Sequence, residues 1–126
     1  MHILILEDNS ATLFLLKRIL RISDCEISNY ARAEHALSAL KNITPDFALV
    51  DIQLAGHLTG LDFIKTVREA GNRMPIIALT AYALDGERQK CIDAGCNEYV
   101  AKPFNVTELT KLLKQYLVEN HSTATA

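Results

Sequence analysis

The stretch Phe47-Ala48-Leu49-Val50-Asp51 decides the fold, because four apolar residues run directly into a carboxylate. A continuous apolar run of this length is typical of a strand that is buried on both faces of a parallel sheet. A carboxylate at the end of such a strand is costly to bury without a partner. The sequence therefore predicts a strand over residues 46–50 that presents Asp51 to a ligand.

The rest of the chain alternates short apolar runs with longer segments of helical period. Right-handed crossovers between parallel strands then give a doubly wound α/β fold, with a five-stranded parallel sheet and five helices. Periodicity alone does not set the strand order. We expect strands at residues 2–6, 25–29, 46–50, 75–79 and 97–101. We expect helices from Asn9-Ser10 onward and at 33–41, 61–70, 84–94, with Gly95 as its C-cap, and 106–118.

Length and composition are those of one ordinary globular domain. The chain has 126 residues, 49% of them hydrophobic and 22% charged, with a net charge of −2. We expect the domain to cover residues 1–118 and a flexible C-terminal tail to cover 119–126, a segment with almost no core-forming residues.

The same composition argues against several classes of partner. The net charge is unlike that of a nucleic-acid-binding surface, and the longest apolar stretch, 76–84, is too short to span a membrane. Met1-His2 leads directly into the first strand without a signal peptide, so we expect a cytoplasmic protein. The three cysteines and four histidines have neither disulfide nor zinc spacing.

Five polar residues follow four of the expected strands directly: Glu7, Asp8, Asp51, Thr80 and Lys102. In doubly wound sheets, ligands bind at the carboxyl ends of the strands. Three carboxylates that converge there repel one another unless a cation lies among them, and oxygen ligands suit Mg²⁺. With a lysine and a hydroxyl added, the set predicts transfer of a phosphoryl group onto an aspartate.

Each of these residues also has a simpler interpretation when taken alone. Glu7 and Asp8 would suit a charged loop before a helix, Asp51 the simple end of a strand, Thr80 a turn or helix cap, and Lys102 a solvated loop. Their occurrence together at one edge of the sheet favours the site.

At this point the chain resembles the receiver domains of two-component response regulators, across residues 2–118. The resemblance rests on Glu7-Asp8, Asp51, Thr80-Ala81 and Lys102-Pro103-Phe104, in that order, with support from Gly60-Leu61, Ala94-Gly95-Cys96 and Tyr99. It implies a flavodoxin-like strand order of 2-1-3-4-5. It also implies a phosphorylation-dependent signalling switch that assists its own Mg²⁺-dependent phosphorylation and dephosphorylation, and that is not otherwise an enzyme.

The resemblance implies a role for each matched residue. Asp51 would accept the phosphoryl group from a histidine kinase or a phosphotransfer protein. Glu7, Asp8, Asp51 and the backbone carbonyl of Gln53 would bind Mg²⁺. Lys102 would contact the phosphoryl group, Thr80 would hydrogen-bond it, and Tyr99 would then turn inward.

Further implied roles concern the loops and the partner. Gly60 and Pro103 would set loop geometry, with a cis Lys102–Pro103 bond. Gln53 and Tyr82, each two positions past a site residue, would tune the lifetime of the phosphorylated state. A downstream protein would bind the face made by the fourth helix, the fifth strand and the fifth helix.

The chain departs from the family pattern at two points. The loop 52–60 lacks the usual proline and is one residue longer, which leaves the path of the loop and the position of the Gln53 carbonyl open. The first acid is Glu7 instead of aspartate, so its longer side chain is expected to reach the metal directly or through water.

Other functions stay in consideration. A phosphohydrolase with an aspartyl nucleophile would have a general acid where Gln53 stands, and a flavin or nucleotide binder would have a glycine-rich loop after Leu6. The sequence leaves open whether the receiver stands alone or belongs to a longer chain, and whether it dimerises on activation.

Overall fold

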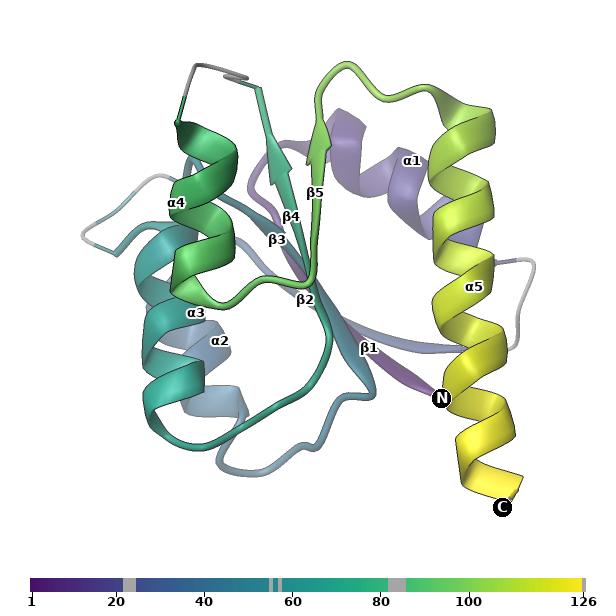
Figure 1. The fold of residues 1–126 in the computed structure, drawn as a ribbon, viewed down its shortest axis with the longest axis horizontal. Coiled ribbons are helices and arrows are strands. Elements are labelled where there is room, and N and C mark those ends of the chain that lie inside the picture. The colour runs from purple at the N-terminus through teal and green to yellow at the C-terminus, as the bar shows by residue number, and fades with distance from the viewer. Residues whose placement is uncertain (22–24, 55, 57, 82–85, 126) are drawn as a thin grey trace.

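The computed structural model describes residues 1–21, 25–54, 56, 58–81 and 86–125, with the backbone alone for 118–125. Within these ranges the strands form one parallel sheet in the order β2-β1-β3-β4-β5 (Figure 1). The predicted α/β class and the strand order are therefore confirmed. The strands are β1 His2–Leu6, β2 Glu26–Tyr30, β3 Phe47–Asp51, β4 Ile76–Thr80 and β5 Glu98–Ala101.

Helices cover both faces of this sheet. Helices α1 and α5 lie on one face, and α2, α3 and α4 lie on the other (Figure 1). Among the described residues, no helix has both the length and the apolar character needed to cross a membrane. The helices are α1 Ser10–Leu20, α2 Ala33–Ala39, α3 Gly60–Glu69, α4 Glu87–Ala94 and α5 Val106–Thr125.

Successive side chains of a strand point to opposite faces of the sheet, so the core has two parts, one on each face. On β1, Ile3 and Ile5 pack with side chains of α1 and α5, whereas Leu4 and Leu6 pack with side chains of α2, α3 and α4. Every residue of β3 and β4 is buried. A strand with both faces covered must be apolar throughout, which explains why the sequence signal there was continuous.

The helix termini follow from local capping chemistry. Asn9 is the N-cap of α1, and its side chain accepts the Thr12 N–H at 3.0 Å. Thr59 and Asp62 form a reciprocal capping box at the start of α3. Gly95 ends α4 as predicted, with a left-handed φ of 116°.

Two predicted helix boundaries are wrong by more than two residues, and the other boundaries differ from the prediction by two residues or fewer. Helix α4 begins at Glu87, not at Leu84, because Gly86 directly before it has a left-handed φ of 84°; Leu84 itself lies outside the described residues. Helix α5 continues to Thr125 and does not end at Val118. Residues 119–125 contain no glycine or proline, and extending an existing helix is far easier than starting one. Flexibility of 119–126 stays a prediction.

Candidate functional site

The register of the sheet brings the acidic side chains together. Leu6 lies opposite Val50, so Glu7 and Asp51 leave neighbouring strands at the same edge. One carboxylate oxygen each from Glu7, Asp8 and Asp51 lie within 4.8 Å of one another. Asp8 is exposed, whereas Glu7 and Asp51 are only 2% and 3% exposed. The predicted convergence of these acids is confirmed, while their roles as metal ligands stay predictions.

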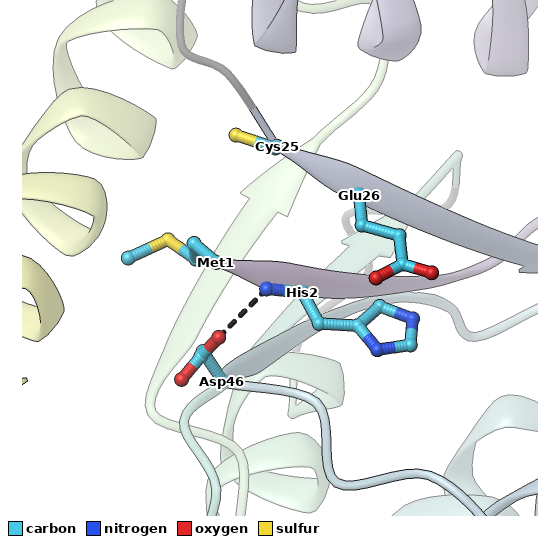
Figure 2. Close-up of a pocket in the computed structure, with 5 residues that line it drawn as sticks. All are labelled: Met1, His2, Cys25, Glu26 and Asp46. Atoms are coloured by element: carbon cyan, nitrogen blue, oxygen red, sulfur yellow. Dashed lines mark hydrogen bonds between the residues drawn. The ribbon is translucent and has the colours of Figure 1, made fainter.

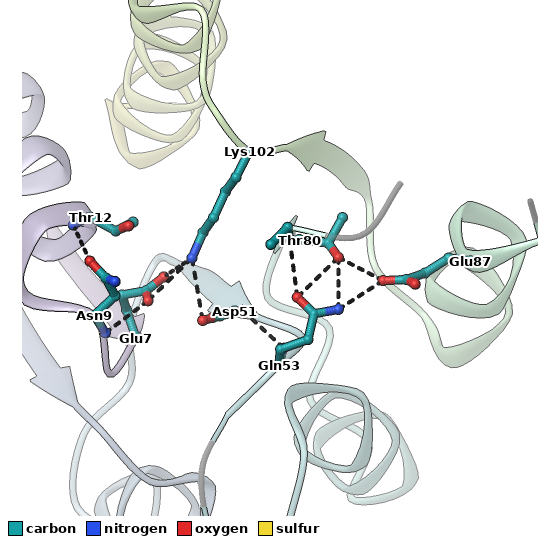
Figure 3. A network of polar contacts seen from close by, with 9 residues as sticks. Glu7, Asn9, Thr12, Asp51, Gln53, Thr80, Glu87 and Lys102 are labelled. Atoms are coloured by element: carbon teal, nitrogen blue, oxygen red, sulfur yellow. Dashed lines mark hydrogen bonds and ion pairs between the residues drawn. The ribbon is translucent and has the colours of Figure 1, made fainter. Parts of the chain in front are cut away.

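Lys102 supplies a positive charge inside this cluster. Its Nζ lies 3.0 Å from Glu7 Oε2 and 3.4 Å from Asp51 Oδ2 (Figure 3). The Lys102–Pro103 peptide bond is cis, as the resemblance implies. The backbone N–H of Lys102 donates to the Thr80 carbonyl at 2.6 Å, which fixes the lysine beside the end of β4.

The donor set fits a divalent cation. The formal charges of the three carboxylates and the one ammonium leave two negative charges. Magnesium binds hard oxygen ligands of this kind and retains several of its waters. Glu7, Asp8 and Asp51 are therefore the side chains that would hold Mg²⁺.

Burial raises the pKa of Glu7 to about 7, and the nearby Asp51 charge acts in the same direction. Hydrogen bonds from Lys102 and from the Asn9 N–H oppose this increase. Without a metal, Glu7 thus takes up a proton more readily than an ordinary glutamate does. A bound divalent cation favours the carboxylate, so proton and metal compete for it.

Gly60 packs directly against the end of β3. A Cβ at this position would lie 2.0 Å from the Asp51 carbonyl oxygen. The Gly60 N–H also donates to the Ile52 carbonyl at 3.2 Å. Only glycine allows this approach, so the longer loop 52–60 still returns to the end of β3.

A second polar network adjoins the first (Figure 3). Its central contact joins Thr80 to Glu87 of α4, with the hydroxyl oxygen 2.6 Å from Glu87 Oε1. The Gln53 amide donates to Thr80 Oγ1 at 2.8 Å and to Glu87 Oε1 at 3.0 Å. The Gln53 backbone N–H donates to Asp51 Oδ1 at 2.9 Å, which connects the two networks. Glu87 could not be predicted from the sequence, because no periodic pattern links it to Thr80.

The remaining predicted residues have mixed outcomes. Tyr99 is half-buried on β5 and packs on the core beneath α2, α3 and α4. Burial and the Glu87 charge raise the pKa of its phenol, and a hydrogen bond with Thr80 opposes them. Tyr82 lies outside the described residues. Metal binding by the Gln53 carbonyl stays a prediction.

A different hollow lies at the opposite end of the sheet (Figure 2). It has a volume of about 490 Å³ and is lined by Met1, His2, Cys25, Glu26 and Asp46. The His2 backbone N–H donates to Asp46 Oδ2 at 2.7 Å, and the His2 ring lies 2.6 Å from the Ser28 hydroxyl. Among the described residues, the acids at the other end form the one cluster able to hold a metal.

Comparison with known proteins agrees with this geometry. A polar-differentiation response regulator of Brucella ovis is 31% identical over 91% of this chain and 94% of its own. The receiver domain of a sensor histidine kinase from Pseudomonas aeruginosa is 36% identical over 91% of this chain and 95% of its own, with a TM-score of 0.78. That structure has a magnesium ion coordinated in its active-site cleft.

A receiver domain protein from Methanospirillum hungatei has a TM-score of 0.83, with 29% identity over 97% of both chains. The family model of the response regulator receiver domain matches residues 3–114. The matched residues include those of both parts of the core and all those of the acidic site. The chain therefore belongs to the response regulator receiver domain family of two-component signalling proteins.

Proposed function

We propose that this chain is a phosphorylation-dependent switch of a two-component system or phosphorelay, and that Asp51 accepts the phosphoryl group. One observation carries the proposal: a carboxylate that is 3% exposed lies 3.4 Å from a lysine ammonium and beside two further acids. Such an arrangement neutralises charge at the point where a phosphoryl group would bind.

The two oxygens of Asp51 have different surroundings. Oδ1 accepts the Gln53 N–H at 2.9 Å, and Oδ2 faces the Lys102 ammonium at 3.4 Å. We assign Oδ2 as the nucleophile, because Lys102 is then placed to neutralise a phosphoryl oxygen. Bound Mg²⁺ would supply further positive charge to the phosphoryl oxygens.

The donor is a phosphohistidine of a histidine kinase or a phosphotransfer protein. Asp51 forms a new P–O bond as the P–N bond breaks, and the imidazole nitrogen retains the electron pair and takes up a proton. The product is an aspartyl phosphate. Water attack on its phosphorus later releases inorganic phosphate and regenerates the carboxylate.

Two surfaces suit the partners of this reaction. An apolar hollow lined by Thr12, Leu15, Phe104 and neighbouring residues opens beside Lys102, and we assign it to the phosphodonor. The downstream protein would bind the face made by α4, β5 and α5. The two helices of this face, α4 and α5, carry the exposed apolar residues Ile92 and Val106, whose exposed fractions are 43% and 49%.

The phosphohydrolase alternative is less well supported. Gln53 occupies the position of the required general acid, and its amide has no acidic proton to give. Its side chain is also committed to Thr80 and Glu87. For location we propose the cytoplasm, where the thiols of Cys25, Cys91 and Cys96 would remain reduced.

The test is incubation with Mg²⁺ and acetyl phosphate, followed by intact mass measurement. We expect one added phosphoryl group on the wild type and none after Asp51→Asn or with a chelator. Glu26→Gln, an exposed acid at the other end of the sheet, is the matched control and should still be phosphorylated. Absence of an adduct on a folded, Mg²⁺-loaded wild type would overturn the proposal.

A further inference from the structure

The Thr80 hydroxyl has one proton and more than one acceptor within reach. Its oxygen lies 2.6 Å from Glu87 Oε1 and 3.1 Å from Gln53 Oε1. An O–H···O⁻ contact of 2.5–2.7 Å is typical of a charge-assisted hydrogen bond, so the proton belongs to the Glu87 carboxylate. The Gln53 amide nitrogen, 2.8 Å away, then donates to the same hydroxyl oxygen.

We propose that Glu87 is a positioning residue that holds the Thr80 hydroxyl in the unphosphorylated protein, and that a phosphoryl group on Asp51 competes with it for that proton. This inference rests on the proposed function of Asp51. A single hydroxyl cannot donate fully to two anions, so the phosphorylated state must weaken or break the Thr80–Glu87 bond. By reciprocity, Glu87 must weaken binding of a phosphoryl-like anion.

Glu87 also connects the site to the first turn of α4. The buried side chains of α4 are Cys91 and Ala94, both in its second half, and Arg88, Gln89 and Lys90 are exposed. The contacts of Glu87 with Thr80 and Gln53 therefore tie a weakly packed turn to β4 and to the loop after β3. Loss of these contacts would free that turn.

The other end of α4 is fixed by a separate set of contacts. Arg68 of α3 donates to the Gly95 carbonyl at 2.9 Å and to Asn97 Oδ1 at 3.0 Å, both just past this end of α4. It also donates to the Asn72 carbonyl, just past the end of α3, at 2.9 Å. None of these groups touches Asp51 or Thr80 in the described contacts. Release of Glu87 would thus let α4 pivot about its C-terminal end.

A cavity beside α4 can receive the released carboxylate. It has a volume of about 410 Å³, and its lining includes Glu87, Lys90 and Gln53. Lys90 follows Glu87 by three positions on the same helix, a spacing at which opposite charges attract. The freed Glu87 would therefore turn from Thr80 toward Lys90, on the face of α4 that borders this cavity.

The test uses the full chain with Mg²⁺ and beryllofluoride, a reversible mimic of the phosphoryl group. Glu87→Ala removes the competing acceptor, Glu87→Gln keeps an acceptor without the charge, and Asp93→Asn changes an acid of α4 that bonds Gln89 on its own helix. We expect Glu87→Ala to bind beryllofluoride about fivefold more tightly or better, Glu87→Gln to lie between it and the wild type, and Asp93→Asn to match the wild type.

A second readout does not depend on anion affinity. In NMR spectra without beryllofluoride, Glu87→Ala should move the Gln53 side-chain amide and the α4 first-turn amides toward their positions in the wild type with beryllofluoride. Unchanged affinity and unchanged spectra in Glu87→Ala, with normal binding by the wild type, would overturn the role of Glu87 alone. A wild type that binds no beryllofluoride would overturn the proposed function as well.

Discussion

Lys102 Nζ lies 3.0 Å from Glu7 Oε2, closer than the 3.4 Å that separates it from Oδ2 of Asp51, the proposed phosphoacceptor. The main partner of the lysine is therefore Glu7, whose side chain has no solvent exposure. This pairing makes the stability of the site depend on charge, on pH and on metal, and it leads to separate predictions for Lys102 and Glu7.

Replacing Lys102 with methionine should destabilise the metal-free protein by about 2 kcal/mol, because Glu7 and Asp51 lose their shared counter-charge. Mg²⁺ should recover most of this loss. Urea unfolding with and without Mg²⁺ measures both effects. Lys65→Met, on the exposed face of α3, is the control and should change little. Equal stability of Lys102→Met and wild type without Mg²⁺ would contradict the pairing.

The raised pKa of Glu7 predicts a pH dependence in the metal-free protein. The folded state retains a proton there that the unfolded chain releases between about pH 4.5 and 7. Because the folded-state pKa is the higher one, this contribution to stability is complete below 4.5 and is lost as pH rises through about 7. The free energy of unfolding, measured across this range, should therefore fall.

Glu7→Gln should remove that pH dependence and weaken Mg²⁺ binding, since the amide neither titrates nor carries charge. In the wild type, Mg²⁺ affinity should rise with pH up to about 7, the pKa of Glu7, because the metal needs the carboxylate. Calorimetric titration at several pH values measures this. A variant that retains the wild-type pH profile would show that another group is responsible.

Gly60→Ala should be severely destabilising, because its Cβ would lie 2.0 Å from the Asp51 carbonyl oxygen. We expect a loss of about 3 kcal/mol in the free energy of unfolding, with reduced phosphorylation of Asp51. Gly71→Ala is the control without a clash: its φ of 84° is left-handed, unlike that of Gly60, but among the described residues no heavy atom other than those of its chain neighbours lies within 4 Å of its Cβ. It should cost about 1 kcal/mol. Similar losses in both variants would refute the steric explanation.

Arg68→Met should destabilise the protein by about 2 kcal/mol, because the guanidinium donates to Gly95 and Asn97 just past the end of α4 and to Asn72 just past the end of α3. Its effect on beryllofluoride affinity should be small, since these acceptors are separate from Thr80 and Glu87. Arg73→Met, at an exposed position, is the control for stability. A large gain in anion affinity would show that both ends of α4 respond to the site.

Much of the fold was predictable because the sheet is parallel and covered on both faces. Residues 47–50 and 76–79 can only be apolar in that position, so their strands are continuous runs in the sequence. The acids that end β1 and β3 were predictable as a cluster for the same reason, since parallel strands place their carboxyl ends at one edge.

The Thr80–Glu87 contact could not be predicted in this way. It depends on where Gly86 turns the chain and on how α4 lies across the sheet, and neither leaves a periodic signal. The preference of Lys102 for Glu7 over Asp51 likewise depends on distances of a few tenths of an ångström. The extension of α5 to Thr125 was not predicted, because residues 119–125 contain few core-forming side chains and a helix does not require them.

The most direct measurement of the central claim locates the phosphoryl group on the chain. After phosphorylation with acetyl phosphate and Mg²⁺, borohydride reduction converts an aspartyl phosphate to homoserine, and peptide mass spectrometry identifies the position. We predict homoserine at position 51 and unmodified side chains at Glu7 and Asp8. Modification at either of those acids, with Asp51 intact, would contradict the assignment of Asp51 as the phosphoacceptor.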